Sequence, residues 1–364
     1  MKILRLETYT KSQVGFVKVI TDEGAVGIGQ MSTFSADITA KVFHQMVAPI
    51  ALGADAFDLE TLERRVMEGT YKFPGSFVCR ALTGLDTALW DLHGKLVGKS
   101  VCELLGGDPN RVLYPYGSSM RRDITPQDEA ARLVRLRDTV GFRAFKIRIG
   151  KVNGHDQDQW PGRTEELVPT VRRAVGDDIT LKVDGNSCYT PKKAIEVAKL
   201  LEDNRVTHFE EPCPYWELDW IAEVTRFINV PVANGEQDYD LKQWARMFWM
   251  HAMDIAQPDV CYIGGITRAR RVCQMAERVG MPVVPHSANL SMVTLFTMHL
   301  LAAIPNAGDF FEFSIEPTPW TDGLYAPALV VRDGQIRIPA GPGWGVTVNP
   351  DWLATAERQV SELS

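Results

Sequence analysis

The sequence contains few cysteines, and no two of them form a motif. Its six cysteines are scattered along 364 residues without a CxxC pair. Disulfide frameworks and zinc ribbons need cysteines at close, paired spacing, so the sequence argues against both. Scattered, reduced thiols are typical of a cytoplasmic protein.

The sequence also lacks long apolar runs and basic clusters. No run approaches the ~18 apolar residues of a membrane span, and the first residues, MKILRLETYTKSQ, contain no apolar export signal. There is no lysine- and arginine-rich run, and 39 basic against 46 acidic residues give a net charge of −7. We therefore predict a cytoplasmic protein that binds neither membranes nor nucleic acids.

The length of the chain predicts more than one structural part. With 364 residues, 45% of them apolar, the chain suits one large domain and a smaller module. Residues 1–111 contain strand-like segments, such as VGFVKVITDEGAVGIGQ, and helical segments, such as RALTGLDTALWDLHGKLVG, which stops at Gly98. We expect an α+β module here.

Short apolar runs alternate with helical segments in residues 112–324. The runs are VLYPYGSS, FRAFKIRIG, ITLKVDGN, THFEEP, VPVANGE, DIAQPD, MPVVPHS and DFFEFS. This alternation predicts βαβ units and a parallel sheet. The number of units favours an α/β fold of one kind, namely a (β/α)8 barrel or a variant of that barrel. Residues 325–364 are expected to form strands and turns that return to the first module.

Three acidic residues follow successive apolar runs at equal spacing. Asp184, Glu210 and Glu236 are each 26 residues apart, about one βα unit. The C-terminal ends of barrel strands meet at one rim, where three unpaired anions would repel each other strongly. Oxygen ligands favour Mg²⁺ over Zn²⁺, so we predict a magnesium site. The alternative is three unrelated acids that cap the following helices.

The alternation of side chains along a strand predicts which face each neighbour of these acids occupies. Adjacent strand residues point to opposite faces, so Glu210 is expected to face the metal and Glu211 the helix layer. Asn186 lies two residues after Asp184 and is expected to share its face as a substrate contact.

Other strand ends carry acid–base and cationic groups. Asp259 ends the run AQPD, and His286 follows 27 residues later in VVPHS. A carboxylate bonded to one imidazole nitrogen orients the ring and raises its basicity. Lys146 and Arg148 lie two residues apart on one face of FKIRIG. Two cations opposite acids and a metal predict a site for a carboxylate substrate, and a solvated basic pair is the alternative.

The ordered set of these motifs resembles the mandelate racemase group of the enolase superfamily. The motifs are Lys146-x-Arg148, Asp184-x-Asn186, Glu210-Glu-Pro, Gly235-Glu236, Pro258-Asp259, His286 and Glu312. The resemblance covers nearly the whole chain and includes LTGLDTALWDLHGKLVGKSVCELLGG in the first module and GPGWGV near the end. Each motif alone is weak, and the ordered set is highly specific.

The resemblance implies a (β/α)7β TIM-like barrel under an N-terminal α+β capping domain, which the C-terminal segment completes. It implies that Asp184, Glu210 and Glu236 bind Mg²⁺. A base then removes the proton α to a carboxylate, and the metal holds the enediolate. Lys146 and Glu312 match positions that bind or stabilise the carboxylate. The group includes racemases, cycloisomerases, epimerases and acid-sugar dehydratases.

Arg148 departs from the family pattern, because many members have a second lysine there as a base. With a pKa above ~12, arginine is a poor proton acceptor at neutral pH. A racemase needs a base on each face of the α-carbon, whereas His286 alone can serve a dehydratase as base and then acid. We therefore expect a Mg²⁺-dependent sugar-acid dehydratase. An isomerase on the same scaffold and a barrel that binds ligand without turnover are the alternatives.

Loops of the capping domain are expected to select the substrate. Tyr71 and Lys72 in YKFPGSF, and His44, are candidate substrate-binding residues; for His44 the alternative is a place on a helix surface. Such groups suit an aldonic or aldaric acid better than an aromatic acid. FEFSIEPT lacks an Asp-x-Asp motif, which argues against a dipeptide epimerase. By resemblance to the family we also expect a homo-oligomer.

Overall fold

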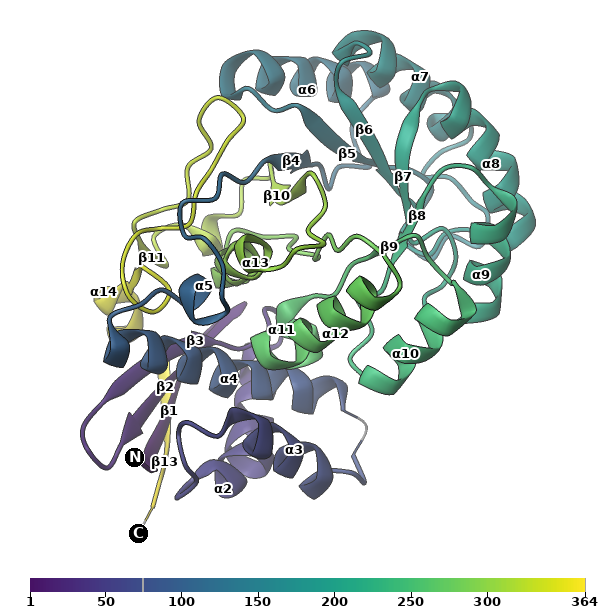
Figure 1. The fold of residues 1–364 in the computed structure, drawn as a ribbon. Coiled ribbons are helices and arrows are strands. Elements are labelled where there is room, and N and C mark those ends of the chain that lie inside the picture. Colours follow the sequence, from purple (N-terminus) through teal and green to yellow (C-terminus); the bar gives the residue numbers. More distant parts are fainter. Residues whose placement is uncertain (74, 364) are drawn as a thin grey trace.

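The computed structural model describes residues 1–73 and 75–363, and an antiparallel sheet lies at one end of it (Figure 1). The strand order is β13-β1-β2-β3. The strands are β1 (Ile3–Lys11), β2 (Val14–Thr21), β3 (Val26–Gln30) and β13 (Glu357–Glu362). Because β13 comes from the end of the chain and pairs with β1, the C-terminal segment completes this sheet.

Helices from the first third of the chain pack on this sheet or on one another. They are α1 (Ala36–Val42), the π-helix η1 (Phe43–Val47), α2 (Ala48–Ala51), α3 (Leu59–Gly69), α4 (Ser76–Val97) and α5 (Val101–Leu104). A side chain at Gly27 or Gly29 of β3 would collide with α4, so these glycines allow the close approach of helix and sheet. Gly98 ends α4 in the left-handed conformation, with φ of 67°, as its sequence predicts.

The second part is a parallel sheet that curls into a barrel. The strand order in this sheet is β10-β4-β5-β6-β7-β8-β9. The strands are β4 (Pro115–Ser118), β5 (Ala144–Arg148), β6 (Thr180–Asp184), β7 (Val206–Glu210), β8 (Val232–Asn234), β9 (Ile255–Ala256) and β10 (Phe311–Ser314). Between β9 and β10, Val283 bridges in parallel to Ala256 and Ala307. The expected TIM-like barrel is confirmed, although MPVVPHS contributes a bridge rather than a strand.

Helices between the strands cover the outside of the barrel (Figure 1). They are α6 (Pro126–Val140), α7 (Arg163–Val175), α8 (Pro191–Asp203), α9 (Leu218–Phe227), α10 (Leu241–Met250), α11 (Val260–Ile263), α12 (Ile266–Arg278) and α13 (Met292–Ala303). In α8, Thr190 accepts a hydrogen bond from the backbone N–H of Lys193, and Pro191 occupies the first turn. Its buried residues, Ala194, Val197, Ala198 and Leu201, share the side that packs on the barrel.

The segment after the barrel contains short elements. They are the 3-10 helix η2 (Pro319–Thr321), β11 (Tyr325–Ala326), β12 (Thr347–Val348) and α14 (Pro350–Ala354), which lead to β13. Across residues 1–73 and 75–363, none of the helices has both the length and the apolar character that crossing a bilayer requires.

Side chains of the first part bind the rim of the barrel. The Gln30 amide donates to Ser291 Oγ at 2.9 Å and accepts from the Met292 backbone N–H at 3.0 Å, at the start of α13. Thr83 of α4 donates to the Cys261 carbonyl of α11 at 3.0 Å. Both contacts lie close in sequence to the strand ends where the predicted site residues occur, so they fix the first part over that rim.

Asp86 of α4 is expected to make stability depend on pH. Its carboxylate accepts from the Thr267 backbone N–H at 3.3 Å, at the start of α12. Burial raises the pKa of Asp86 to about 7, whereas an unfolded aspartate has a pKa of about 3.9. At pH values between these two pKa values, Asp86 keeps its proton in the folded chain and has lost it in the unfolded chain. The contribution of Asp86 to folding stability therefore falls as pH rises from about 4 to about 7.

The test compares wild type with Asp86→Asn. Urea unfolding across this pH range should give a free energy of unfolding with a flatter pH profile in the variant. Asp203→Asn, at an exposed position on α8, serves as the control and should keep the wild-type profile. Identical profiles for wild type and Asp86→Asn would contradict the assignment.

Candidate active site

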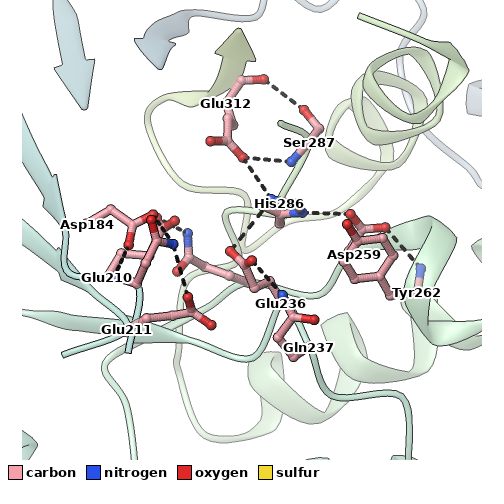
Figure 2. A network of polar contacts seen from close by, with 12 residues as sticks. Asp184, Glu210, Glu211, Glu236, Gln237, Asp259, Tyr262, His286, Ser287 and Glu312 are labelled. Atoms are coloured by element: carbon pink, nitrogen blue, oxygen red, sulfur yellow. Dashed lines mark hydrogen bonds and ion pairs between the residues drawn. The ribbon is translucent and has the colours of Figure 1, made fainter. Parts of the chain in front are cut away.

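Strand ends bring the predicted metal-binding acids together. Asp184 ends β6 and Glu210 ends β7, and the two are direct register partners. Arg148, at the end of β5, pairs with Asp184 in the same way. Glu236 follows β8 by two residues. All three acids are buried, and Figure 2 shows them on neighbouring strand ends at one rim.

Two cations lie among these acids rather than opposite them. Lys146 Nζ is 2.8 Å from Glu312 Oε1 and 3.8 Å from Asp184 Oδ2, and it contacts Glu210 directly. Arg148 forms an ion pair with Asp184. Direct pairing follows from burial, because an unpaired charge without water costs several kcal/mol at least. As a result, no group of three His, Cys, Asp or Glu side chains within the described residues is already arranged to hold a metal ion.

The donor chemistry of the site nevertheless fits a divalent cation. Glu236 Oε2 and Glu211 Oε1 are buried without a hydrogen-bond partner. Burial raises the pKa of Glu236, a sign that its negative charge is poorly compensated even beside His286. Carboxylates also outnumber cations. Lys146, Arg148, Lys182 and His286 lie near six acids: Asp184, Glu210, Glu211, Glu236, Asp259 and Glu312. A hard cation with oxygen ligands would balance this excess of negative charge.

His286 and Asp259 form the expected pair. His286 Nδ1 lies 2.7 Å from Asp259 Oδ2. Asp259 Oδ1 accepts from the backbone N–H groups of Cys261 and Tyr262, at 2.6 and 3.0 Å. The start of α11 thus fixes the carboxylate, which orients the imidazole. His286 Nε2 then points toward the carboxylates, 3.6 Å from Glu236 Oε2 (Figure 2).

The charged groups around His286 determine the pKa of its imidazole. Burial alone lowers the pKa of His286, but Glu236, Glu312 and Asp259 outweigh burial and raise the pKa to about 10. A cation bound by Glu236 would offset the charge of that carboxylate. The pKa of His286 would then fall toward the range in which an imidazole can accept a proton.

Glu312 of β10 is held rigidly between two elements. Its Oε1 accepts from Ser118 Oγ and its Oε2 from the Ser287 backbone N–H, both at 2.8 Å. Burial raises the pKa of Glu312, but Lys146 and His286 outweigh this and lower it to about 2. Glu312 therefore stays ionised and holds Lys146 in place.

The prediction that Glu211 faces the helix layer is wrong. Glu211 has a φ of 41°, in the left-handed region, so strand alternation stops at Glu210. Its carboxylate lies with the other acids (Figure 2) and accepts from Asn186 Nδ2 at 3.3 Å. Burial and the charges of Glu236 and Glu210 raise the pKa of Glu211 to about 8. Asn186 does share the face of Asp184, since its Nδ2 also donates to Asp184 Oδ2 at 3.2 Å.

The structure does not bring all candidate substrate residues to the rim. His44 hydrogen-bonds through both ring nitrogens, to Thr8 of β1 and Ser361 of β13, each at 2.8 Å. It is thus tied into the antiparallel sheet, which corrects the expected substrate contact. Tyr71 and Lys72 lie in the exposed loop between α3 and α4, and Pro74 of this loop lies outside the described residues. For Tyr71 and Lys72 a substrate contact stays a prediction.

Sequence reasoning missed polar residues that support the site. His208 Nε2 lies 3.0 Å from Glu210 Oε2, and Gln257 donates to the same oxygen at 2.7 Å. Each lies two residues before a predicted site residue, so strand alternation could have found both. Arg122, in the loop after β4, donates to Asn186 Oδ1 at 2.7 Å. No spacing pattern marks Arg122.

Two family models match this chain. The model described as "Mandelate racemase / muconate lactonizing enzyme, N-terminal domain" matches residues 3–106, and "Enolase C-terminal domain-like" matches residues 128–352. The chain belongs to the mandelate racemase group of the enolase superfamily. The resemblance inferred from the ordered motifs is therefore confirmed, and the protein is an enzyme of this superfamily.

Relatives within this group catalyse more than one reaction. An arabinonate dehydratase from Saccharolobus solfataricus is 28% identical over 337 residues, or 91% of this chain and 87% of that protein. A D-galactarolactone cycloisomerase from Agrobacterium fabrum is 30% identical over 75% of this chain and 72% of that protein. A solved structure from Roseobacter denitrificans, provisionally described as a racemase, is 55% identical, with a TM-score of 0.98 over 100% of both chains.

Proposed function

We propose that this enzyme is a Mg²⁺-dependent sugar-acid dehydratase. It removes the proton α to the carboxylate of an aldonic or aldaric acid and eliminates the β-hydroxyl, which gives a 2-keto-3-deoxy acid. One observation carries the proposal: His286, backed by Asp259, directs Nε2 toward the carboxylates, and this nitrogen forms no hydrogen bond to any described residue.

The cations of the site are poor candidates for a second base. Burial lowers the pKa of Lys146, but Glu210 and Glu312 outweigh burial and raise it well above its ordinary value. Lys146 therefore keeps its proton. Arginine is in general a poor proton acceptor, and the guanidinium of Arg148 is already paired with Asp184. Racemisation needs a base on each face of the α-carbon, so a site with one base favours elimination.

Asp184, Glu210 and Glu236 are the proposed metal ligands. When bound, Mg²⁺ supplies positive charge that stabilises the negative charge developing on the substrate carboxylate. Lys146, held by Glu312, adds a fixed positive charge near the same oxygens.

His286 moves one proton twice. Nε2 accepts the α-proton, and the electron pair of the C–H bond shifts toward the carboxylate. The β C–O bond then breaks as Nε2 returns the proton to the departing hydroxyl, which leaves as water. The resulting enol tautomerises to the 2-keto acid. Asp259 stabilises the imidazolium between the two transfers.

An isomerase is the second candidate. It is favoured by the 30% identity to a D-galactarolactone cycloisomerase and by the 55% identity to a protein provisionally described as a racemase. Racemisation or epimerisation also begins with loss of the α-proton, but a proton then returns to C2 and the β-hydroxyl stays.

Incubation in D₂O with Mg²⁺ and a panel of aldonic and aldaric acids separates these reactions. Dehydration should give a 2-keto acid with solvent deuterium at C3, because the enol takes its new proton from the medium. Deuterium at C2 of recovered acid without 2-keto product would contradict the dehydratase and indicate the isomerase. No exchange and no product, with Mg²⁺ bound, would indicate a binding protein.

A further inference from the structure

A cavity of about 290 Å³ opens beside the carboxylate cluster, between loops that follow the barrel strands. Asn186, Glu211 and Glu236 line it, so it is continuous with the proposed active site. The rest of its wall includes Asn153 from the loop after β5, Tyr215 and Trp216 from the loop after β7, and Gln237. A substrate held at the cluster can extend its far end into this space.

The chemistry of this wall suits hydroxyl groups better than a second carboxylate. Among the described residues that line the cavity, none is a lysine, an arginine or a histidine. The amides of Asn153 and Gln237 can donate to and accept from hydroxyls, and Trp216, 58% exposed, offers an apolar ring surface. A carboxylate here would lose water without a cationic side chain in the cavity wall, because Arg122 and Arg148 are already bound to Asn186 Oδ1 behind that wall.

Glu211 is fixed in this wall with a free acceptor. Its backbone is left-handed, which is strained for a glutamate. Hydrogen bonds hold it there, from Glu211 N to the Ala233 carbonyl at 3.0 Å and from Ser187 N to the Glu211 carbonyl at 2.9 Å. The side chain is 4% exposed, and Oε1 has no partner. Glu211 thus lines the cavity, and its Oε1 is a buried oxygen without a hydrogen-bond partner.

Arg80, a cation of the first part, could bind a second carboxylate only by giving up its present contacts. Arg80 of α4 donates to Ser32 Oγ at 2.6 Å, and its guanidinium stacks 3.6 Å from the centre of the Tyr262 ring. The Tyr262 ring lies 5.7 Å from the His286 ring, centre to centre. Arg80 is therefore close to the site but already engaged.

We propose that Glu211 binds hydroxyl groups at the distal end of the substrate, so that the enzyme prefers aldonic acids, which carry one carboxylate, over aldaric acids, which carry two. The inference rests on the proposed function and narrows its substrate class. It places selectivity in loops of the barrel, whereas the sequence favoured loops of the capping domain.

The test measures binding separately from turnover. Calorimetry with His286→Asn and Mg²⁺ compares five- and six-carbon aldonic acids with the aldaric acids of matching configuration. Aldonic acids should bind about tenfold more tightly. Adding Glu211→Gln should weaken the binding of aldonic acids about tenfold and narrow the difference between aldonic and aldaric affinities, since the amide replaces one carboxyl oxygen with an NH₂ group that cannot accept a hydrogen bond. Glu223→Gln, at an exposed position on α9, is the matched control and should change neither affinity.

Equal or tighter binding of aldaric acids would overturn the inference, as would no binding of any acid or unchanged affinities in Glu211→Gln. If Glu211→Gln does not fold, Trp216→Ala replaces it, because this exposed side chain can be removed without opening the core, and aldonic binding should again weaken. Tight aldonic binding together with no 2-keto acid from the wild type would contradict the dehydratase and still support the preference.

Discussion

Replacing His286 with asparagine is expected to lower 2-keto acid formation by about 10³-fold while Mg²⁺ binding is retained. The substitution removes the nitrogen that accepts the α-proton and returns it to the leaving hydroxyl. Since His286 is not among the proposed metal ligands, calorimetric titration with Mg²⁺ should give a similar affinity in both proteins. Full turnover in the variant would refute the assigned role.

Asp259→Asn is the matched variant for the dyad. Its amide oxygen can still accept from the backbone N–H groups of Cys261 and Tyr262, so the start of α11 should keep its cap. The new amide NH₂ cannot accept a hydrogen bond from His286 Nδ1, so the ring loses its orientation. Turnover should therefore fall with little change in folding stability.

Replacing Lys146 with methionine is expected to lower the free energy of unfolding by about 3–5 kcal/mol. Lys146 is fully buried and pairs with both Glu210 and Glu312. Methionine has a similar shape but leaves these carboxylates without their partner. Urea unfolding without metal measures the loss, and added Mg²⁺ should recover part of it by supplying positive charge to Glu210.

Lys193→Met provides the control for this substitution. Lys193 Nζ lies 3.8 Å from Glu196 Oε2 on the surface of α8, where both side chains are solvated. Such an exposed pair contributes about 0.5 kcal/mol or less. A loss of similar size in the two variants would show that Lys146 does not stabilise the buried cluster.

Local patterns in the sequence predicted which residues reach the rim. Asp184, Glu210 and Asp259 follow short apolar runs, and the barrel places the C-terminal ends of parallel strands side by side. Period-two alternation predicted that Asn186 shares the face of Asp184, and the two side chains do meet, although Asn186 lies beyond the strand end with a φ of 41°. The same rule failed at Glu211, because it holds only while the backbone stays extended and Glu211 is left-handed.

Contacts between distant segments could not be predicted in this way. The sequence placed Lys146 and Arg148 opposite the acids, whereas burial drives both cations into direct ion pairs with them. The sequence predicted His44 as a candidate substrate contact, yet Ser361, from the other end of the chain, hydrogen-bonds to one of its ring nitrogens. Nothing near His44 in the sequence indicates that partner.

The sequence by itself determined the barrel, the family and the strand ends that carry the acids and the histidine, because strand and helix periodicity are local properties that set which face and which end each residue occupies. Only the tertiary structure decided which charges neutralise one another, where an acceptor is left free and which cavity it borders. Those outcomes depend on burial and on side chains that meet only after the chain has folded.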